Sequence, residues 1–385
     1  MNVLVLTSQF YAPSGAEGLQ IEFALELASR SGVSVTLMAL GDPHDPKVSL
    51  AKSKLEAKGL RVEILKLQLH PSLWSLWSAA RRLRKWIVCE EVDVVETGLY
   101  TPSIVAALAT QGLKIPLIHG VHAPFYRDMK LGRWNLRKHF WRLGLRGENV
   151  FFYSISDFVG QCWAGFFGIS SNRIRRIYNS IAAHHFSAEN SRGSLYKELG
   201  IDAGEKLILF VGRIRRDKGV EILLDAVAND LIELHAHLIF IGAVEPEYAD
   251  LGERIKELSL RNDSRIHHLG YRNDVATWFA SVDVFVLPTQ REGFGMVIME
   301  ALAAGCPTVA TTVDALPEIF GESGAILVAP QDTSALRKAI SRQLALDLNQ
   351  RKALAGRGRC FASQFTTVRR ADELLKYLQT CQRQM

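Results

Sequence analysis

The residues of this sequence best suited to chemistry stand between Arg291 and Gly305, in the segment REGFGMVIMEALAAG. The apolar run Val282 to Leu287 before it predicts a buried strand that ends at Pro288, and the Ala- and Met-rich letters after it predict a helix. The loop and the first helical positions comprise Glu292, Gly293, Phe294, Gly295, Met296 and Val297. The first N–H groups of a helix have no partners within it and lie at its positive end. We therefore expect those of Gly295, Met296 and Val297 to face an anion, most simply a phosphate.

Two carboxylates flank this predicted phosphate site. Glu292 lies in the loop and Glu300 lies in the helix, with seven residues between them. Carboxylates repel phosphate but accept hydrogen bonds from vicinal hydroxyls. A ligand with a diphosphate centre and a sugar at each end would suit this arrangement, and a sugar nucleotide has that form.

A second group of charges stands in the segment VGRIRRDKGVE, after the apolar run Leu207 to Val211. Gly212 follows the predicted strand, and Gly219 opens a predicted helix. Between them, Arg213 and Lys218 can converge on one anion, Arg as a planar fork and Lys as a mobile point charge. The pair predicts positive charge at the diphosphate.

The elements that must position these residues follow an alternating pattern of strands and helices. In the first half, strands are predicted at Val3 to Leu6, Val33 to Ala39, Val62 to Leu65, Val92 to Val95, Ile115 to Ile118, Val150 to Tyr153 and within Asn172 to Tyr178. In the second half, they are predicted at Leu207 to Val211, His237 to Ile241, Arg265 to His268, Val284 to Leu287 and Thr308 to Ala310. Helical stretches separate them, which indicates an α/β fold with two Rossmann-like domains.

Two places in the first half could contact a ligand. The loop YAPSGAEG contains Gly15 and Ala16 but is not G-x-G-x-x-G, so no nicotinamide site is predicted. The segment HGVHAPFYRD places His119 and His122 after a strand, at the edge where open α/β sheets bind ligands. Asp128, six residues beyond His122, is a weaker candidate for an acceptor cleft.

The segment FVLPTQREGFGMVIMEALAAGCPTVAT resembles the signature of the retaining, nucleotide-sugar-dependent glycosyltransferases with two Rossmann-like domains, the GT-B architecture. These family 4-like proteins, also called glycosyl transferases group 1, are often described by an E-x(7)-E motif, which Glu292 and Glu300 match. Their G-R-x(4)-K-G pattern matches residue for residue at Gly212, Arg213, Lys218 and Gly219.

The resemblance implies roles for individual residues. His122, which fits better than His119, and Glu292 would orient the donor sugar, and Glu300 would bind the ribose. The loop with Gly15 would approach the diphosphate, although Ala16 replaces a second glycine. Gly270 and Tyr271 match positions whose backbone meets the nucleotide base. Asp314 and Ala315 stand where two glycines are usual, and Asn179 would hold the hinge.

The resemblance also implies a domain organisation and a mechanism. We expect an acceptor-side domain over 1–180, a linker over 181–205, a nucleotide-sugar domain over 206–365, facing the first across a cleft, and a helix over 366–385 that returns to the first domain. Transfer would retain the anomeric configuration without a covalent nucleophile. The donor would be UDP- or GDP-linked, with no further cofactor. No Asp-x-Asp motif occurs, so a metal ion is not expected.

Two alternatives remain open at the level of sequence. A sugar-nucleotide epimerase shares the two-domain architecture but needs no acceptor. A non-catalytic partner would bind nucleotide or lipid without turnover. The donor sugar, the acceptor, the linkage and the oligomeric state are not predicted.

Composition narrows the class of protein. The chain has 385 residues, 48% hydrophobic and 22% charged, as expected of two globular domains. Its five cysteines are scattered without metal-ligand spacing, which favours reduced thiols in a cytoplasmic protein. The start, MNVLVLTSQF, predicts a strand rather than a signal peptide, and no apolar run reaches the ~20 residues of a membrane span.

The net charge of +6 is concentrated in one region. Between His70 and Val150 there are 12 Lys and Arg residues against 6 acids. In Ser72 to Trp86 and Lys130 to Arg146 these bases alternate with tryptophan and leucine. This pattern is typical of a surface that contacts anionic lipid, and a lipid-linked acceptor would be located in that membrane. The alternative is an ordinary solvated face. No nucleic-acid-binding motif accompanies the bases, so nucleic acid is not expected as a partner.

Overall fold

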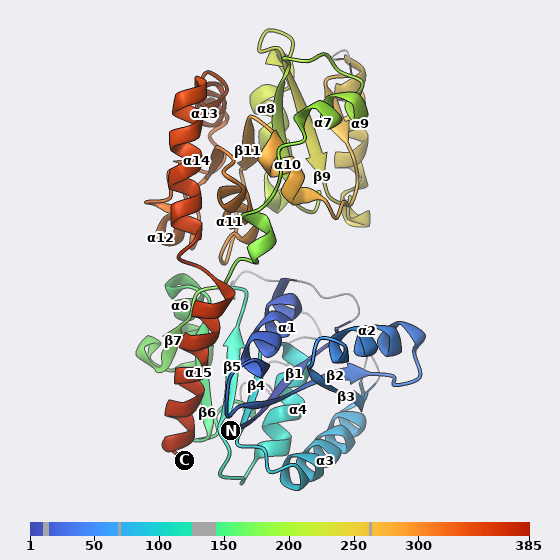
Figure 1. Cartoon of the computed structure of the whole chain (residues 1–385), viewed down its shortest axis with the longest axis vertical. Coiled ribbons are helices and arrows are strands. Elements are labelled where there is room, and N and C mark those ends of the chain that lie inside the picture. The colour runs from blue at the N-terminus through green and yellow to red at the C-terminus, as the bar shows by residue number, and fades with distance from the viewer. Residues whose placement is uncertain (11–14, 68–70, 125–143, 262–263) are drawn as a thin grey trace. The chain divides into compact units, whose positions relative to one another are not determined.

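The computed structural model describes residues 1–10, 15–67, 71–124, 144–261 and 264–385. The chain forms two compact units, one made of Met1–Ser180 with Thr367–Met385 and the other of Ile181–Thr366 (Figure 1). Each unit is a parallel sheet with helices packed on it, which confirms the predicted α/β class with two Rossmann-like domains.

The first unit is organised around a seven-stranded parallel sheet of order β3-β2-β1-β4-β5-β6-β7. The strands are β1 (Asn2–Thr7), β2 (Ser34–Gly41), β3 (Arg61–Lys66), β4 (Val94–Thr97), β5 (Leu117–Val121), β6 (Val150–Ser154) and β7 (Ile174–Arg176). The described helices are α1 (Gly15–Ala28), α2 (Pro46–Glu56), α3 (Leu73–Cys89), α4 (Tyr100–Thr110), α6 (Asp157–Phe167) and α15 (Thr367–Arg383). The central strands are buried along their length because helices cover the sheet.

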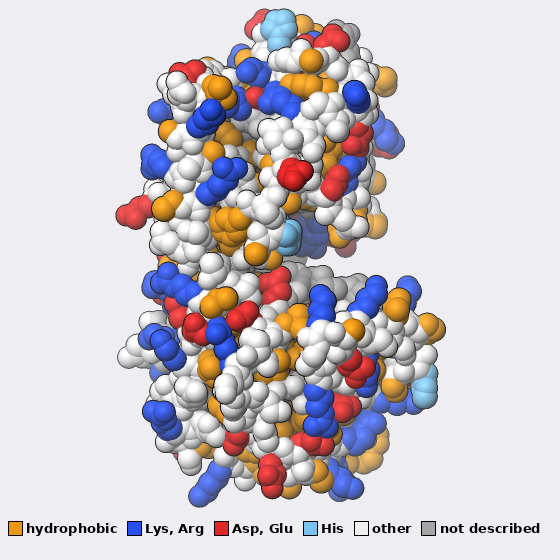
Figure 2. All heavy atoms as spheres, in the orientation of Figure 1, with side chains coloured by type: hydrophobic (Ala, Val, Ile, Leu, Met, Phe, Trp, Pro, Cys, Tyr) orange, Lys and Arg blue, Asp and Glu red, His pale blue; other side chains and the backbone are white. Residues whose placement is uncertain are grey.

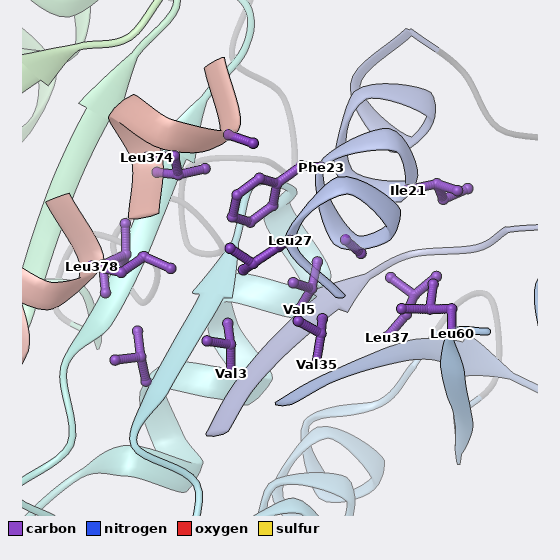
Figure 3. Close-up of a cluster of buried hydrophobic side chains, with 14 of the residues drawn as sticks. Val3, Val5, Ile21, Phe23, Leu27, Val35, Leu37, Leu60, Leu374 and Leu378 are labelled. Atoms are coloured by element: carbon purple, nitrogen blue, oxygen red, sulfur yellow. The ribbon is translucent and has the colours of Figure 1, made fainter. Parts of the chain in front are cut away.

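One face of this sheet shows how the helices complete the core. Val3 and Val5 of β1 pack with Phe23 and Leu27 of α1 in a single buried cluster (Figure 3). Leu374 and Leu378 of α15 belong to the same cluster, although they follow the whole second unit in sequence. Burying a leucine or phenylalanine stabilises a fold by about 1.5–3 kcal/mol. The predicted return of the last helix to the first domain is thus realised by apolar packing.

Some predicted bounds in the first unit were wrong. The expected loop YAPSGAEG ends before Gly18, because α1 begins at Gly15, with the acidic Glu17 in its first turn where the helix dipole favours it. The strand expected to end at Ile118 continues to Val121, so His119 lies within β5. Of the strand expected within Asn172 to Tyr178, only Ile174–Arg176 pairs with β6.

The second unit has a six-stranded parallel sheet of order β10-β9-β8-β11-β12-β13. The strands are β8 (Lys206–Val211), β9 (Ala236–Ile241), β10 (Ile266–His268), β11 (Val284–Leu287), β12 (Thr308–Thr311) and β13 (Ile326–Val328). The described helices are α7 (Arg192–Leu199), α8 (Val220–Val227), α9 (Ala249–Arg261), α10 (Val275–Ser281), α11 (Met296–Ala304), α12 (Leu316–Phe320), α13 (Thr333–Leu344) and α14 (Leu348–Ala362). A one-turn 3₁₀ helix, Arg216–Lys218, precedes α8.

A buried carboxylate fastens two helices to this sheet. Asp283, almost fully buried before β11, accepts from Arg192 of α7 at 2.6 Å and lies 2.8 Å from Arg351 of α14. A buried charge is tolerated only with such partners. Through this contact α7, within the segment 181–205, is held in the second unit. No helix in the described part of the chain is long and apolar enough to cross a bilayer.

Candidate nucleotide-sugar site

Two loops of the second unit meet because they leave adjacent strands at the same edge of the sheet. The loop 212–219 follows β8 and the loop 288–295 follows β11, its direct neighbour. Asp217 joins them, because its carbonyl oxygen accepts from the N–H of Gln290 at 2.8 Å and from the hydroxyl of Thr289 at 3.0 Å. Gly219, at a φ of +75°, lies so close that an added Cβ would be 1.9 Å from the carbonyl oxygen of Pro288. Glycine is required there.

The two loops bring Lys218 and Glu292 together. The Lys218 ammonium donates to the Glu292 carboxylate at 2.8 Å, and each side chain retains about a fifth of its exposure. Sequence reasoning placed both residues in the site but did not predict that they pair. The pair puts one positive and one negative group at the carboxyl edge of neighbouring strands, where open α/β sheets bind ligands.

Arg213, expected to converge with Lys218 on one anion, has a different acidic partner in this structure. Its guanidinium is 62% exposed and pairs with Glu245 at 2.7 Å. Glu245 also lies 3.6 Å from Arg215, which in turn pairs with Asp217 at 2.9 Å. Glu245, from the loop after β9, thus faces both arginines, and Asp217 of the loop itself faces Arg215. The sequence of a single strand and its loop does not reveal such pairing.

The start of α11 has the predicted form. Gly295 precedes the helix at a φ of +87°, and an added Cβ there would be 2.8 Å from Leu316 and 2.9 Å from Phe320. Phe294 is buried and packs against Phe365 at 6.3 Å between ring centroids, so the aromatic residue anchors the loop. The half-buried Met296 and Val297 occupy the first turn, whose N–H groups have no acceptor within the helix.

Asp314 was missed as a site residue. Its carboxylate accepts from the backbone N–H of Glu292 at 2.9 Å, and Asp314 itself has a positive φ of 48°. Asp tolerates this conformation better than most residues with a side chain. It thus replaces one of the expected glycines and also fixes the backbone that carries Glu292. The sequence signal for Asp314 as a site residue was its position just after β12, a buried strand that pairs with β11.

The other residues predicted for this unit are described by their burial and backbone conformation. Glu300 is half-buried in the middle of α11, and Gly293 is buried beside Glu292. Gly212 follows β8 at a φ of +154°, and Gly270 has a φ of +65° with its carbonyl accepting from the Gly242 N–H at 2.7 Å. The side chain of Tyr271 is 79% exposed.

His122 belongs to the first unit, directly after β5. The Tyr153 hydroxyl lies 3.4 Å from its Nε2, while Nδ1 is buried and has no hydrogen-bond partner among the described residues. Burial, with smaller contributions from the charges of Arg370 and His119, lowers the His122 pKa to about 3, so the ring is neutral at pH 7. His119 is buried and bonds Ser103 at 2.8 Å, which supports its lower ranking as a ligand contact.

Of the other residues predicted for the first unit, the structure describes Gly15 and Ala16 but not Asp128. Gly15 and Ala16 form the start of α1, and an added Cβ at Gly15 would meet nothing within 4 Å. Asp128 and most of Lys130 to Arg146 lie outside the described residues. Among the residues that are described, no group of three His, Cys, Asp or Glu side chains could hold a metal ion.

Two family sequence patterns match this chain. The pattern for Glycosyltransferase Family 4 matches residues 13–184, and that for Glycosyl transferases group 1 matches residues 205–345. The chain belongs to the family 4-like glycosyltransferases of the GT-B fold. In this GT-B protein the first pattern falls on the unit with His122, and the second on the unit with Lys218 and Glu292.

Individual relatives resemble parts or all of this GT-B protein. N-acetyl-alpha-D-glucosaminyl L-malate synthase of Bacillus anthracis is 30% identical over 170 residues, 43% of each chain. The chain thus aligns with less than half the length of this relative. Among solved structures, a glycosyltransferase of Rickettsia africae has a TM-score of 0.82 at 18% identity, covering 99% of this chain and 98% of its own. HepE of Anabaena, solved with UDP, has a TM-score of 0.79 at 22% identity, covering 99% and 100%. These structures share the fold.

Proposed function

We propose that this protein transfers a sugar from a nucleoside-diphosphate sugar to a hydroxyl acceptor, with retention of anomeric configuration, in the synthesis of a glycan, polysaccharide or glycolipid. The observation that carries the proposal is the Lys218–Glu292 pair, 2.8 Å apart on loops that leave adjacent strands. Glu292 lies in the loop that leads into α11, whose first-turn N–H groups favour an anion.

The proposed reaction needs positive charge at the leaving group. Breaking the anomeric C–O bond leaves negative charge on the departing diphosphate, and donors fixed in advance stabilise that charge most. Lys218 and the first turn of α11 supply such donors, and Arg213 adds a second cation on an exposed side chain. Because these groups supply the charge, the proposed transfer is independent of a metal ion.

Donor binding changes the partner of Lys218 in this proposal. A diphosphate carries more charge than one carboxylate and competes with Glu292 for the ammonium. Glu292 is then left beside the donor as an acceptor for sugar hydroxyls, while its backbone stays fixed by Asp314 at 2.9 Å. Glu300, farther along α11, binds the ribose, and the backbone at Gly270 and Tyr271 lies at the base.

The acceptor is activated by the donor itself. In the proposed front-face transfer, the acceptor oxygen forms the new bond to the anomeric carbon as the bond to the diphosphate oxygen breaks. That leaving phosphate oxygen takes the proton of the acceptor hydroxyl. His122, neutral at pH 7, orients the donor sugar and is not required as a base.

The names of relatives support the donor and acceptor classes. HepE of Anabaena was also solved with UDP-glucose. LpsB of Rhizobium meliloti, 30% identical over 168 residues, is named a lipopolysaccharide core biosynthesis mannosyltransferase. A UDP- or GDP-linked donor and a carbohydrate or lipid-linked acceptor are consistent with the names of both relatives.

A two-step experiment tests the proposal. Nucleotide sugars are first screened for thermal stabilisation, because a ligand that binds only the folded state raises its melting temperature. The best donor is then incubated with and without hydroxyl acceptors, and the anomeric configuration of the product is read by NMR. A new sugar nucleotide formed from donor alone would favour an epimerase. Stabilisation without any turnover would favour a non-catalytic binder, and an inverted product would contradict retention.

We further propose that α3 contacts an anionic membrane at the cytoplasmic face. Leu73 and Trp74 are 69% and 73% exposed, and Trp74 stacks on Trp77 at 5.0 Å between ring centroids. The Arg81 guanidinium lies 4.7 Å from the centre of the Trp77 ring. Figure 2 shows hydrophobic and basic side chains side by side over the part of the first unit where Figure 1 places α2 and α3. Exposed indole beside guanidinium is suited to the headgroup region of a bilayer.

A further inference from the structure

A glutamate occupies a core position at the carboxyl end of β4. In the parallel register, Val94 pairs with Val3, and Glu96, two residues on and on the same face, pairs with Val5 and Ile118. Val3, Val5, Val94 and Ile118 belong to the apolar cluster under α1 and α15, and Glu96 is fully buried beside it. An apolar side chain would suit this position better for stability, since burying a carboxylate costs several kcal/mol.

Glu96 is surrounded by polar groups from three other elements. Its carboxylate accepts from the Tyr153 hydroxyl of β6 at 2.8 Å and from the Gln20 amide of α1 at 3.0 Å. Arg370 of α15 is 96% buried, donates to the Leu19 carbonyl at 3.3 Å, and supplies positive charge to Glu96 and Tyr153. Burial raises the pKa of Glu96, and these hydrogen bonds and Arg370 oppose that rise.

The Tyr153 hydroxyl connects Glu96 to His122. It lies 3.4 Å from His122 Nε2 on one side and 2.8 Å from a Glu96 oxygen on the other. Two glycines leave room for the rings. An added Cβ at Gly98 would be 2.5 Å from His122 Nε2, and one at Gly120 would be 2.4 Å from the Tyr153 ring.

The direction of these hydrogen bonds determines which His122 nitrogen carries the proton. The Arg370 charge and the hydrogen bonds from Tyr153 and Gln20 favour the ionised form of Glu96. An ionised carboxylate can only accept, so the Tyr153 hydroxyl donates its proton to Glu96. The tyrosine oxygen can then only accept a hydrogen bond from His122. His122 therefore needs a protonated Nε2 to form this hydrogen bond. In a neutral ring Nδ1 then has a lone pair, and in the described structure this atom has no protein partner.

We propose that Glu96 and Tyr153 are positioning residues that hold His122 in its Nε2–H form and leave Nδ1 to accept a hydrogen bond from a hydroxyl of the bound sugar. The part that concerns the sugar rests on the proposed transfer reaction. The part that concerns the proton on His122 does not, because it follows from the contacts of the folded first unit.

The test reads the His122 ring directly in ¹⁵N-histidine-labelled full-length protein at pH 7.5, with His122→Gln used to assign its signals. The parent protein is expected to show a protonated Nε2 and an unprotonated Nδ1. Tyr153→Phe removes the acceptor but keeps the ring, so both forms should appear. Glu96→Gln retains an acceptor for the tyrosine proton and should keep the Nε2–H form, whereas Glu96→Leu should lose it.

Ser103→Ala is the matched control. It removes a buried 2.8 Å hydrogen bond to a neighbouring histidine, His119, and should leave the His122 signals unchanged. Addition of the nucleotide sugar found by thermal screening should shift Nδ1 of His122 in the parent. In transfer assays Tyr153→Phe should lower kcat about tenfold, as expected for one lost hydrogen bond, with little change in donor KM.

The outcomes separate this inference from the proposed function. A protonated Nδ1 in the parent, or an unchanged Nε2–H form in both Tyr153→Phe and Glu96→Leu, would overturn it even if transfer is observed. Should the parent protein prove inactive with every donor, the proposed function fails, and the ¹⁵N signals still decide whether Glu96 and Tyr153 set the state of His122.

Discussion

At the scale of single residues, the proposed site contains a cation and a carboxylate that pair with each other. An anionic ligand binds there by replacing the carboxylate as the partner of the cation. Lys218 and Glu292 are 2.8 Å apart and only partly exposed, so their attraction is screened less than that of a surface pair. An anion that takes Lys218 must replace this contact. The two residues should therefore have separable effects, Lys218 on the leaving group and Glu292 on the sugar.

Lys218→Ala is expected to slow transfer by about a hundredfold, because one donor fixed at the leaving diphosphate is lost. Steady-state kinetics with saturating donor measures the effect. Lys256→Ala is the control, since Lys256 pairs with Glu253 at 2.9 Å on the exposed surface of the same unit. Equal rates for the Lys218 variant and the parent would contradict the proposed diphosphate site.

Activity should persist in excess EDTA, because side chains and a helix end supply the positive charge at the leaving group in the proposed mechanism. The comparison is of initial rates in protein pretreated with chelator, with and without added magnesium or manganese. Complete loss of activity that either ion restores would mean that a bound cation supplies this charge.

Acid should destabilise the first unit through His119. Burial lowers its pKa to about 3 in the folded protein, against about 6.5 when unfolded, so below pH 6.5 the unfolded chain binds a proton that the folded chain does not. Stability is then lost by about 1.4 kcal/mol for each pH unit down to pH ~3.

Urea unfolding at pH 7.5 and 5.5 measures this loss. His119→Asn keeps a polar group near Ser103 but does not titrate, and should lose less stability between the two pH values. The comparison also isolates His119 from Glu96, whose raised pKa acts in the opposite direction. An identical loss in the variant and the parent would assign the effect to other groups.

At the scale of elements, α3 carries two kinds of basic residue, those that hydrogen-bond to neighbouring carbonyl groups and those that face solvent. Arg84 donates to the Ala109 and Gln111 carbonyls at 3.0 and 2.7 Å, and Arg82 donates to the Lys66 carbonyl at 2.5 Å, so both help to dock the helix. Arg81 and Lys85 are exposed. Only Arg81, Lys85 and the tryptophan stack offer contacts to lipid without loss of these docking hydrogen bonds.

Arg81→Glu with Lys85→Glu is expected to abolish most binding to anionic vesicles at low salt, since each base near such a surface contributes about 1 kcal/mol. Vesicle sedimentation measures binding, which should weaken with salt in the parent. Lys338→Glu with Arg342→Glu, two exposed bases on α13 of the second unit, makes the same charge change away from α2 and α3 and is the control. A parent protein that ignores anionic vesicles even at low salt would support a solvated face.

The elements show which features a single sequence can predict. Val284–Leu287 is an uninterrupted apolar run, and the structure confirms it as β11 without a shift. Ile326–Val328 was missed because the strand is three residues long and only half-buried. The contacts of Arg213 with Glu245 and of Asp314 with Glu292 join residues 32 and 22 positions apart. Local periodicity contains no information on such contacts, so the motif residues could be named from the sequence but their partners could not.

At the scale of the whole molecule, the first unit is assembled from both ends of the sequence. Leu374 and Leu378 of α15 share a core with Val3 and Phe23. Leu374→Ala should destabilise this unit by about 2–5 kcal/mol, as for other buried leucines. Hydrogen exchange read by peptide should show faster exchange in β1 and α1, with β8 and β9 unchanged. Gln379→Ala, exposed on the same helix, is the control, and equal loosening of both units would contradict the assignment.

The split core also bears on how the chain is synthesised. Residues 181–366 must all leave the ribosome before α15 can reach the sheet formed by the first 180 residues. At about 5–20 residues per second, translating that stretch takes on the order of 10–40 s. During this interval Phe23, Leu27 and their neighbours lack the leucines of α15 that cover them. The nascent chain therefore presents an apolar surface to chaperones while its second unit is already free to fold.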